Sequence, residues 1–264
     1  MKKRVLSLML VLLMTLTLIP LESLAEAAAA PGTCGSKGDN LTWALDEKNG
    51  VLTISGQGDM ADYSEEAPAP WAECYMETVS VEKGVTGIGE YAFSSYTAAT
   101  IELPEGLERI GVYAFAQSEC FSEIKIPDSV KSIGSGAFCR CIGLEKATLP
   151  QKLTELSDSL FEDCAGLTEV NIPQSVTAIG ENAFKGCKAL AVISIPDGVK
   201  TIGKEAFASC AAVEELKIPT GVERIGESAF KGTNIESVIF DGTKERWTAI
   251  GGETSGIDLS LIHI

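Results

Sequence analysis

The sequence is poor in histidine, the side chain that most often acts as a general acid or base in enzymes. It has a single histidine, His263, next to the end of an apolar segment. A Cys–His or Ser–His–acid site would depend on that one side chain. No Walker loop, dinucleotide fingerprint or set of zinc ligands is present, and a regular repeat array offers no obvious cleft for a pair of glycosidase carboxylates. We therefore expect no enzyme, with no catalytic residue, cofactor or metal.

Basic residues are also scarce. The chain has 21 Lys and Arg against 37 Asp and Glu, a net charge of −16. Such a chain should be repelled by nucleic acid and by anionic membrane surfaces. It could attract basic partners or divalent cations. Asp59, Asp62, Glu65 and Glu66 form a loop cluster with the ligand types of a Ca²⁺ site, but we favour a solvated acidic loop.

Only one long apolar run occurs, from Val5 to Leu21. Lys2, Lys3 and Arg4 precede it, and Ser23-Leu24-Ala25 supplies the small residues that a signal peptidase reads. This pattern predicts a secretory signal peptide over residues 1–25. The alternative is a membrane anchor, because the run is just long enough to span a bilayer. No cysteine follows the run to carry a lipid, so we expect a soluble chain after cleavage, with a flexible leader over residues 26–33.

A repeat of 23 residues dominates the rest of the chain. Prolines recur with this spacing, and each has a phenylalanine eleven residues later. An unbroken period of this kind predicts a solenoid with one coil per repeat. Phe93 belongs to an earlier copy, in which Glu82 stands in place of the proline. The two columns are Pro104, Pro127, Pro150, Pro173, Pro196 and Pro219, and Phe115, Phe138, Phe161, Phe184, Phe207 and Phe230.

The columns of the repeat have distinct physical roles. In the coil that starts at Pro173, Ile193-Ser194-Ile195 alternates apolar and polar residues and stops at Pro196, which predicts a strand with one buried face. A second short strand is expected at residues 199–202, and a helical or 3₁₀ turn at A-F-x-x-C. The residues expected to point inward are Val176, Ile179, Ala183, Phe184, Cys187, Leu190, Ile193 and Ile195.

One column holds glycine in every coil except one. Ser157 replaces glycine there, and in the same coil Leu160 replaces alanine. Because serine disfavours positive φ, we expect the column to require a small residue rather than a left-handed backbone. We also predict that the coil with Ser157 is the most distorted. The glycines are Gly89, Gly111, Gly134, Gly180, Gly203 and Gly226.

Both ends of the array carry residues suited to caps. Leu41–Leu45 and Val51–Ser55 alternate around a turn that contains Asn49-Gly50, which predicts a β-hairpin. Trp43 and Trp71 are expected to cover the first coil. At the other end, Thr243 is a predicted N-cap for a helix that contains Trp247 and Ile250, and a final strand is predicted in the tail that ends at Ile264.

The eight cysteines fall into three groups. Four share one inward column, where we favour buried free thiols, although the spacing between stacked strands would also permit bridges. Cys34 and Cys74 both lie in the N-terminal cap, and the sequence leaves open whether they form a disulfide. Cys120 and Cys139 have no assigned role. The column consists of Cys141, Cys164, Cys187 and Cys210.

The exposed face of the predicted strands is the candidate binding surface. It carries charges of both signs, so the sign of a partner's charge cannot be deduced. Such a row suits an extended protein or a glycan, and the alternative is a merely solvated sheet face. One outward column consists of Glu102, Lys125, Thr148, Asn171, Ser194 and Lys217, and the column beside it of Glu123, Lys146, Glu169, Val192 and Glu215.

The consensus V-x-x-I-G-x-x-A-F-x-x-C-x-x-L-x-x-I-x-I-P resembles the repeat of BspA-type leucine-rich repeat proteins, which occur on bacterial and some protist surfaces. The resemblance covers about Val79 to Phe240, and flanking segments such as Cys34-Gly35, Pro70-Trp71 and Thr243–Ile250 are similar to the family's caps. It implies an extracellular ligand-binding or adhesive role, in some members toward host matrix proteins. The asparagine ladder of other leucine-rich repeats is absent, so their ligands are not transferred.

The resulting hypothesis is a secreted or cell-surface, non-catalytic module, a monomer, that recognises a protein or glycan along its sheet. The alternative is a structural spacer without a ligand of its own. We expect a leucine-rich-repeat-like solenoid, mainly β with short helical or 3₁₀ turns and a parallel sheet of about seven coils. The expected parts are an N-terminal hairpin cap at 34–78, the solenoid at 79–240 and a C-terminal cap at 241–264.

Overall fold

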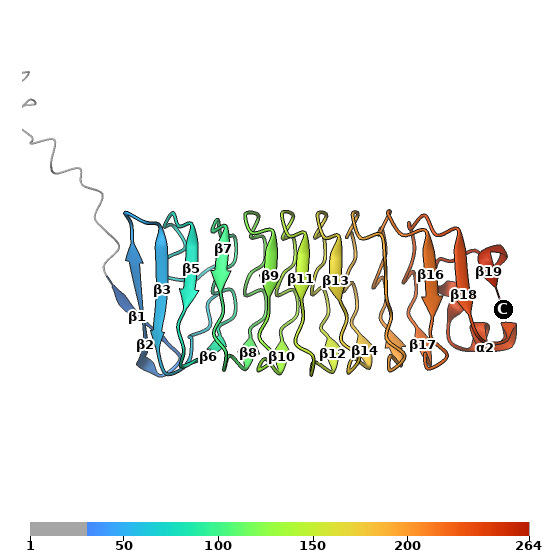
Figure 1. The fold of residues 1–264 in the computed structure, drawn as a ribbon, viewed down its shortest axis with the longest axis horizontal. Helices are drawn as coiled ribbons and strands as arrows, with labels where there is room; N and C mark the ends of the chain where they lie inside the picture. The colour runs from blue at the N-terminus through green and yellow to red at the C-terminus, as the bar shows by residue number, and fades with distance from the viewer. Residues whose placement is uncertain (1–30, 264) are drawn as a thin grey trace, which may run out of the picture. The chain divides into compact units, whose positions relative to one another are not determined.

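The computed structural model describes residues 31–263, which form one compact unit. In this unit the chain winds into a stack of coils whose strands lie side by side (Figure 1). The predicted solenoid is confirmed, with about nine turns instead of about seven. The prediction counted too few coils because it relied on the repeated proline. β3 (Val51–Gly56) and β18 (Ser237–Phe240) pair in parallel with the repeat strands although no proline follows them. The predicted signal peptide and most of the leader lie outside the described residues.

The N-terminal cap is the predicted hairpin with one further strand. β2 (Gly38–Asp46) pairs antiparallel with β3 and, on its other side, with β1 (Gly32–Gly35), so β1 includes two residues expected in the leader. The turn closes at Gly50, whose φ of +62° suits glycine. Trp43 and Trp71 are buried, as predicted, and Trp71 stacks on Phe93 with ring centroids 5.7 Å apart. The cap therefore continues the aromatic core of the repeats.

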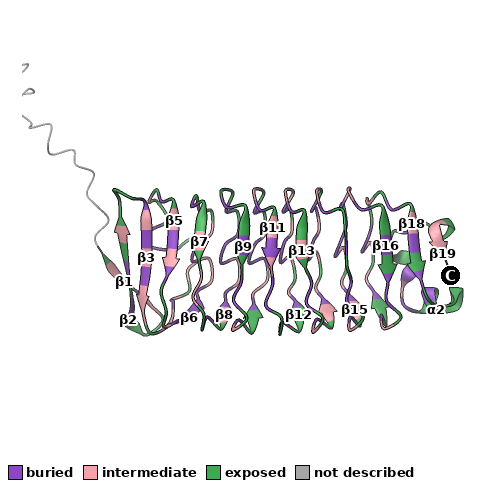
Figure 2. Ribbon diagram, viewed as in Figure 1, coloured by how far each residue is buried: buried purple, intermediate pink, exposed green. Residues whose placement is uncertain are grey.

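A first row of parallel strands forms one face, here called the ribbon face. Most of its strands bury alternate residues and leave the others partly or fully exposed (Figure 2). The row is interrupted between β7 and β9 and again after β13, where Ile193 makes only a single bridge to Leu216, so the strand predicted at 193–195 is not formed. Its strands are β3, β5 (Thr78–Val81), β7 (Thr100–Glu102), β9 (Glu123–Lys125), β11 (Lys146–Thr148), β13 (Glu169–Asn171), β16 (Glu215–Ile218), β18 and β19 (Ile262–His263).

A second row of short strands follows further along each coil. Most of them span two residues, fewer than the four predicted at 199–202, because the chain bends at the glycine column directly after them. This row is interrupted once, between β10 and β12. Its strands are β4 (Gly58–Asp59), β6 (Val85–Ile88), β8 (Arg109–Ile110), β10 (Ser132–Ile133), β12 (Glu155–Leu156), β14 (Ala178–Ile179), β15 (Thr201–Ile202) and β17 (Arg224–Ile225).

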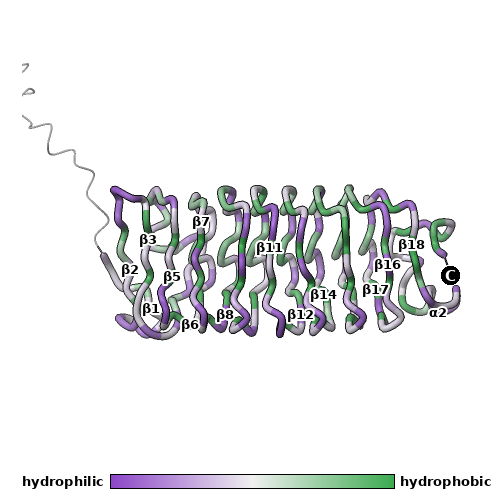
Figure 3. The backbone as a smooth tube through the Cα atoms, in the orientation of Figure 1, coloured by the Kyte–Doolittle hydropathy of each residue, from purple (hydrophilic) through white to green (hydrophobic). Residues whose placement is uncertain are grey.

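A column of stacked phenylalanine rings fills the interior of the stack. From Phe93 to Phe230, successive centroids are 5.2 to 5.6 Å apart and successive planes differ by 2° to 19°. All these rings are buried. Hydrophobic and hydrophilic residues alternate along each coil (Figure 3), which places one apolar row against the next. The stacked geometry is a favourable arrangement for aromatic pairs, and it confirms the predicted core.

The buried cysteine column follows a hydrogen-bonding rule that the sequence did not reveal. Each thiol lies 3.0 to 3.2 Å from the carbonyl oxygen of the phenylalanine one coil earlier. Ser118, in the same column, donates from Oγ to Phe93 in the same way, at 2.9 Å. The column therefore selects a short side chain that carries a donor. The four cysteines of the column, together with Cys34 and Cys74, are free thiols.

The glycine column requires small residues and not a left-handed backbone, as predicted, since none of its six glycines has a positive φ. A Cβ at Gly203 would lie 2.5 Å from the backbone carbon of Gly180 in the preceding coil. At Ser157 the backbone of the second row separates, and the serine hydroxyl instead donates to the carbonyl oxygen of Ile133. The predicted distortion thus coincides with the interruption between β10 and β12.

The segment around each Ala-Phe pair forms separate turns. In each turn a backbone N–H donates a hydrogen bond to the carbonyl oxygen three residues earlier, for example from Cys139 to Gly136. A continuous helix does not form, because two residues per coil adopt the left-handed conformation. The first set, with φ of 52° to 63°, is Tyr91, Tyr113, Gly136, Ser159, Asn182, Glu205 and Ser228. The second set, with φ of 59° to 76°, is Ser95, Gln117, Arg140, Asp163, Gly186, Ser209 and Gly232.

The C-terminal cap contains the predicted helix. In α2 (Lys244–Ala249), the Oγ1 of Thr243 accepts a hydrogen bond from the N–H of Arg246. Trp247 is buried and packs edge-on against Phe240, with centroids 5.2 Å apart. Two 3₁₀ turns follow, η2 (Gly252–Thr254) and η3 (Leu259–Leu261), and β19 then pairs with β18 as the expected last strand. Within residues 31–263, no helix has the length and apolar character needed to cross a membrane.

Candidate functional site

The ribbon face brings the predicted contact residues into two columns, which the interruptions of the strand row divide into segments. Lys146 of β11 is in register with Glu123 and Glu169, and Thr148 is in register with Lys125 and Asn171. The remaining predicted residues lie on the same face in the neighbouring coils, at Glu102 on β7, Ser194 beside the Ile193 bridge, and Glu215 and Lys217 on β16. The arrangement follows from the two-residue period of a strand, which sends alternate side chains outward.

Some of these side chains already have partners within the protein. Lys146 Nζ lies 3.0 Å from a carboxylate oxygen of Glu169, and this hydrogen bond and charge raise the pKa of Lys146. Asn171 Oδ1 accepts a hydrogen bond from the Leu149 N–H at 3.1 Å. Glu102 accepts one from Ser80 Oγ at 3.2 Å. These residues therefore brace neighbouring coils as well as facing solvent.

Other charged side chains of the ribbon face have no partner among the described residues. Lys125, Lys217 and Glu215 are exposed, and their side chains make no hydrogen bond or ion pair to any residue that the structure describes. Two apolar side chains lie among them, Val192 with 73% of its surface exposed and Ile239 with 53%. Ile239 is in register with Lys217. A surface with free charges and isolated apolar contacts is suited to recognition of another molecule.

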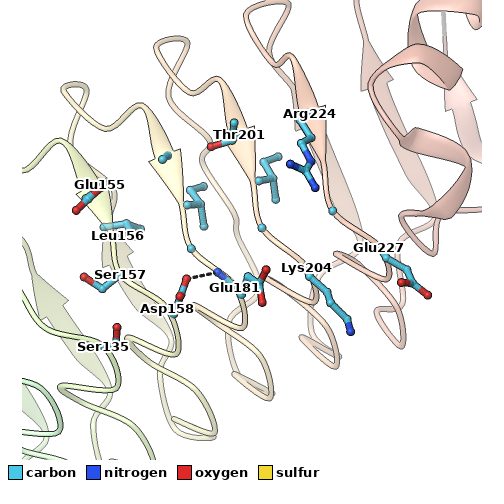
Figure 4. A pocket seen from close by; sticks show the side chains of 16 residues that line it. Ser135, Glu155, Leu156, Ser157, Asp158, Glu181, Thr201, Lys204, Arg224 and Glu227 are labelled. Atoms are coloured by element: carbon cyan, nitrogen blue, oxygen red, sulfur yellow. Dashed lines mark hydrogen bonds between the residues drawn. The ribbon is translucent and has the colours of Figure 1, made fainter.

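A groove that sequence reasoning missed runs along the second row of strands. Its volume is about 620 Å³ and it follows β12, β14, β15 and β17. The glycine column forms its floor, since residues without side chains leave a trough between two outward columns (Figure 4). The walls carry both signs of charge, with Lys204, Arg224 and Glu227 toward one end and Glu155, Asp158 and Glu181 toward the other. The glycine column and the small residues before it, such as Ala178, were the available signal.

The acidic loop considered for Ca²⁺ has its carboxylates directed to separate partners. Asp59 accepts hydrogen bonds from Thr86 Oγ1 at 2.7 Å and from Arg109 at 3.0 Å, and both bonds contribute to lowering its pKa. Asp62 accepts from the Glu90 N–H at 2.9 Å. Across residues 31–263, no group of three His, Cys, Asp or Glu side chains is arranged to hold a metal ion. His263 is exposed on β19.

Taken together, the coil geometry, the aromatic stack and the capped ends define a leucine-rich-repeat-like solenoid. Residues 69–191 and 131–251 match the model of the BspA type leucine rich repeat region, with six copies. The chain therefore belongs to the BspA-type leucine-rich repeat family. Repeat proteins of this bacterial surface type point to a binding or scaffold role. Among curated proteins, no sequence matches the chain.

Several solved structures share the fold. A leucine-rich repeat protein from Bacteroides ovatus has a TM-score of 0.57 and 23% identity, and the match covers 78% of this chain and 65% of that protein, so this chain spans less than two thirds of its length. A leucine rich cell surface protein from Faecalibacterium prausnitzii matches with a TM-score of 0.45 and 17% identity over 87% of this chain and 99% of that one. The T. pallidum leucine rich repeat protein matches with a TM-score of 0.47 and 23% identity, and the match covers 80% of this chain and 94% of that protein. At 23% identity, the likeness to the Bacteroides ovatus protein is one of fold.

Proposed function

We propose that this protein is a secreted or cell-surface, non-catalytic binding module that recognises an extracellular protein or glycan along the ribbon face. The observation that carries the proposal is the column of outward side chains in which Lys125 and Lys217 are left without partners inside the protein. Free charged groups at regular spacing lose little on binding, because no internal ion pair has to be broken first. Membership of a family with cell-surface relatives supports the location.

Binding by this face needs no movement of the fold. The ribbon strands are held by ladders to neighbouring coils and by the buried phenylalanine column. A rigid row of contacts loses less entropy on association than a flexible loop does. Val192 and Ile239 supply apolar area between the charged groups. We expect a ligand that lies across several coils instead of one that enters a pocket.

The test compares two double variants with the same change in charge. Lys125→Ala with Lys217→Ala removes the free lysines of the ribbon face. Lys152→Ala with Lys188→Ala removes two exposed lysines that lie outside that face and also lack ion pairs. Binding is measured to immobilised extracellular-matrix proteins and purified cell-wall glycans, with melting temperature as a control for folding.

We expect the ribbon pair to weaken binding about tenfold or more and the control pair to leave it within about twofold. Neither pair should lower the melting temperature by more than a few degrees, since none of the four lysines is ion-paired. Equal effects of the two pairs would place the contact elsewhere, on the groove or the caps. Failure of the unsubstituted protein to bind any of the probes would favour the structural spacer.

A further inference from the structure

A cleft lies between the N-terminal cap and the first coils, well away from the ribbon contacts. Its volume is about 370 Å³, within the range of small-ligand sites. We call it the cap cleft and define it by six of the residues that line it, Ser64, Glu65, Trp71, Tyr91, Tyr96 and Gln117. Two smaller cavities of about 300 and 270 Å³ share lining residues with it. The cleft therefore continues along the surface in both directions.

Tyr96 carries a polar group without a partner. Only 5% of its surface is exposed, and its Oη makes no hydrogen bond to any residue of the described chain. Tyr96 lines both the cap cleft and the 270 Å³ cavity beside it. A buried hydroxyl without a partner is unfavourable by about 1–3 kcal/mol. The oxygen atom itself is shielded from solvent, so a hydroxyl group in the cleft would supply the missing bond only after the Tyr96 side chain turns toward the cleft.

Tyr96 occupies a position of the repeat at which other coils have a different hydrogen-bonding pattern. It stands in the column that holds Ser118 and the four buried cysteines in later coils, where a short side chain donates to a phenylalanine carbonyl. Tyr96 departs from that rule. Its ring packs edge-on against Phe93 with centroids 5.8 Å apart, and its hydroxyl has no hydrogen-bond partner among the described residues. The repeat architecture therefore does not explain the oxygen atom.

Two tyrosines form an aromatic wall along the cleft. Tyr91 and Tyr113 have ring centroids 5.2 Å apart, with planes tilted by 40°. Both line the 300 Å³ cavity, and Tyr91 also lines the cap cleft. The ring of Tyr113 lies over Gly136, where a Cβ would collide with it. Both tyrosines are held at positive φ, so the wall is fixed by the backbone of the coils.

The surrounding groups favour one class of ligand. Ser64, Glu65 and Gln117 offer hydrogen-bond donors and acceptors at the rim. Carboxylates stand near Tyr91, which disfavours an anion in the cleft, and the mixture of polar groups disfavours a purely apolar molecule. A sugar ring combines hydroxyl groups on its edge with C–H groups on its faces, and aromatic rings present an electron-rich face to such hydrogens.

We propose that the cap cleft is a second binding site, independent of the ribbon face, that takes a neutral saccharide. The apolar face of the sugar rests on Tyr91 and Tyr113, and the Tyr96 side chain turns so that its Oη pairs with one sugar hydroxyl. The length of the adjoining cavities accommodates an oligosaccharide rather than a single ring. This site concerns different residues from the ribbon face, so either proposal can fail without the other.

The experiment titrates the full chain with neutral trisaccharides of glucose, mannose and N-acetylglucosamine, with a sialylated trisaccharide as the anionic comparison and a proline-rich peptide as the alternative partner for tyrosines. Binding is followed by calorimetry and by saturation-transfer NMR. The variants are Tyr96→Phe, which deletes one oxygen atom, and the double variant Tyr91→Ala with Tyr113→Ala. Tyr63→Phe is the matched control, because Tyr63 contacts Trp71 without lining the cleft.

We expect at least one neutral trisaccharide to bind, Tyr96→Phe to weaken that binding about 5- to 10-fold, and the double variant to abolish it. Tyr96→Phe should not lower the melting temperature, since the lost oxygen has no partner in the free protein. Tyr63→Phe should leave the affinity unchanged. Absence of saccharide binding, equal affinity in Tyr96→Phe, or a preference for the sialylated sugar or the peptide would each overturn the proposal.

Discussion

The sulfur of Cys187 lies 3.2 Å from the carbonyl oxygen of Phe161, one coil earlier in the stack. We predict that Cys187→Ser, which keeps a donor of similar size, changes the free energy of unfolding by less than about 1 kcal/mol. Cys187→Val removes the donor and adds bulk, so it should lower stability by about 1–3 kcal/mol. Urea denaturation of both variants measures the difference. Equal losses in the two variants would contradict selection for a donor in this column.

The phenylalanine column should be the main source of packing energy. Phe184 is fully buried between Phe161 and Phe207. We expect Phe184→Ala to lower the free energy of unfolding by about 3–5 kcal/mol, because it leaves a cavity between two rings. Phe184→Leu fills most of that space and should lose about half as much. A loss below about 1 kcal/mol for the alanine variant would contradict a shared aromatic core.

Gly203 and Gly198 offer a matched pair of glycines in one coil. A Cβ at Gly203 would lie 2.5 Å from the backbone of the preceding coil, whereas one at Gly198 would lie 3.3 Å from the nearest atom. Neither residue has a positive φ. Gly203→Ala should lower stability by about 2 kcal/mol or more, since backbone cannot move aside easily. Gly198→Ala should stay within about 1 kcal/mol. Thermal unfolding of the two variants tests this contrast.

Ser157 can be used to ask whether its hydroxyl compensates for the separated strands. Ser157→Ala removes the hydrogen bond to Ile133 and should lower stability by about 1 kcal/mol. Ser157→Gly lets the backbone approach as in the other coils, so the amide at position 157 should become more protected from hydrogen exchange. An unchanged exchange rate in the glycine variant would place the cause of the separation elsewhere in the coil.

Stability should fall at alkaline pH. Burial raises the pKa of Cys34 and Cys139 to about 11 and of Cys210 to about 12, against 9.0 for a free thiol. Below pH 9 the thiols are protonated in both the folded and the unfolded chain. Above it the unfolded chain loses protons that the folded chain keeps, so the free energy of unfolding decreases between about pH 9 and pH 12. Denaturation at several pH values should show a shallower decrease for Cys210→Ala than for the parent protein.

The sequence was sufficient to predict the solenoid, because its inward columns repeat at fixed spacing. The Phe column, the hairpin with Trp43, and the helix capped by Thr243 all depend on local patterns of polarity and turn chemistry, and the structure confirms them. The second row of strands is interrupted at the coil with Ser157, where a distortion was predicted from a single exception in a size-restricted column, whereas the interruptions of the ribbon row at other coils were not predicted.

Features that depend on contacts between coils could not be predicted. The left-handed residues include Glu205 and Tyr113, whose side chains give no local reason for positive φ; the geometry is imposed by hydrogen bonds between coils. The missing strand at 193–195 has the same polarity pattern as its neighbours. The groove and the cap cleft arise where residues from several coils leave space, which no single repeat contains. The binding role of the ten predicted ribbon residues stays a prediction.

The interruptions in the two rows of strands do not coincide. The ribbon row opens between β7 and β9 and after β13, whereas the second row opens between β10 and β12. Every coil junction in this region is thus held by a ladder on at least one side, with the phenylalanine rings continuous through all of them. A force along the long axis meets no cross-section at which both ladders are absent. Because of this offset, the stack of coils resists extension along its long axis at every junction in this region.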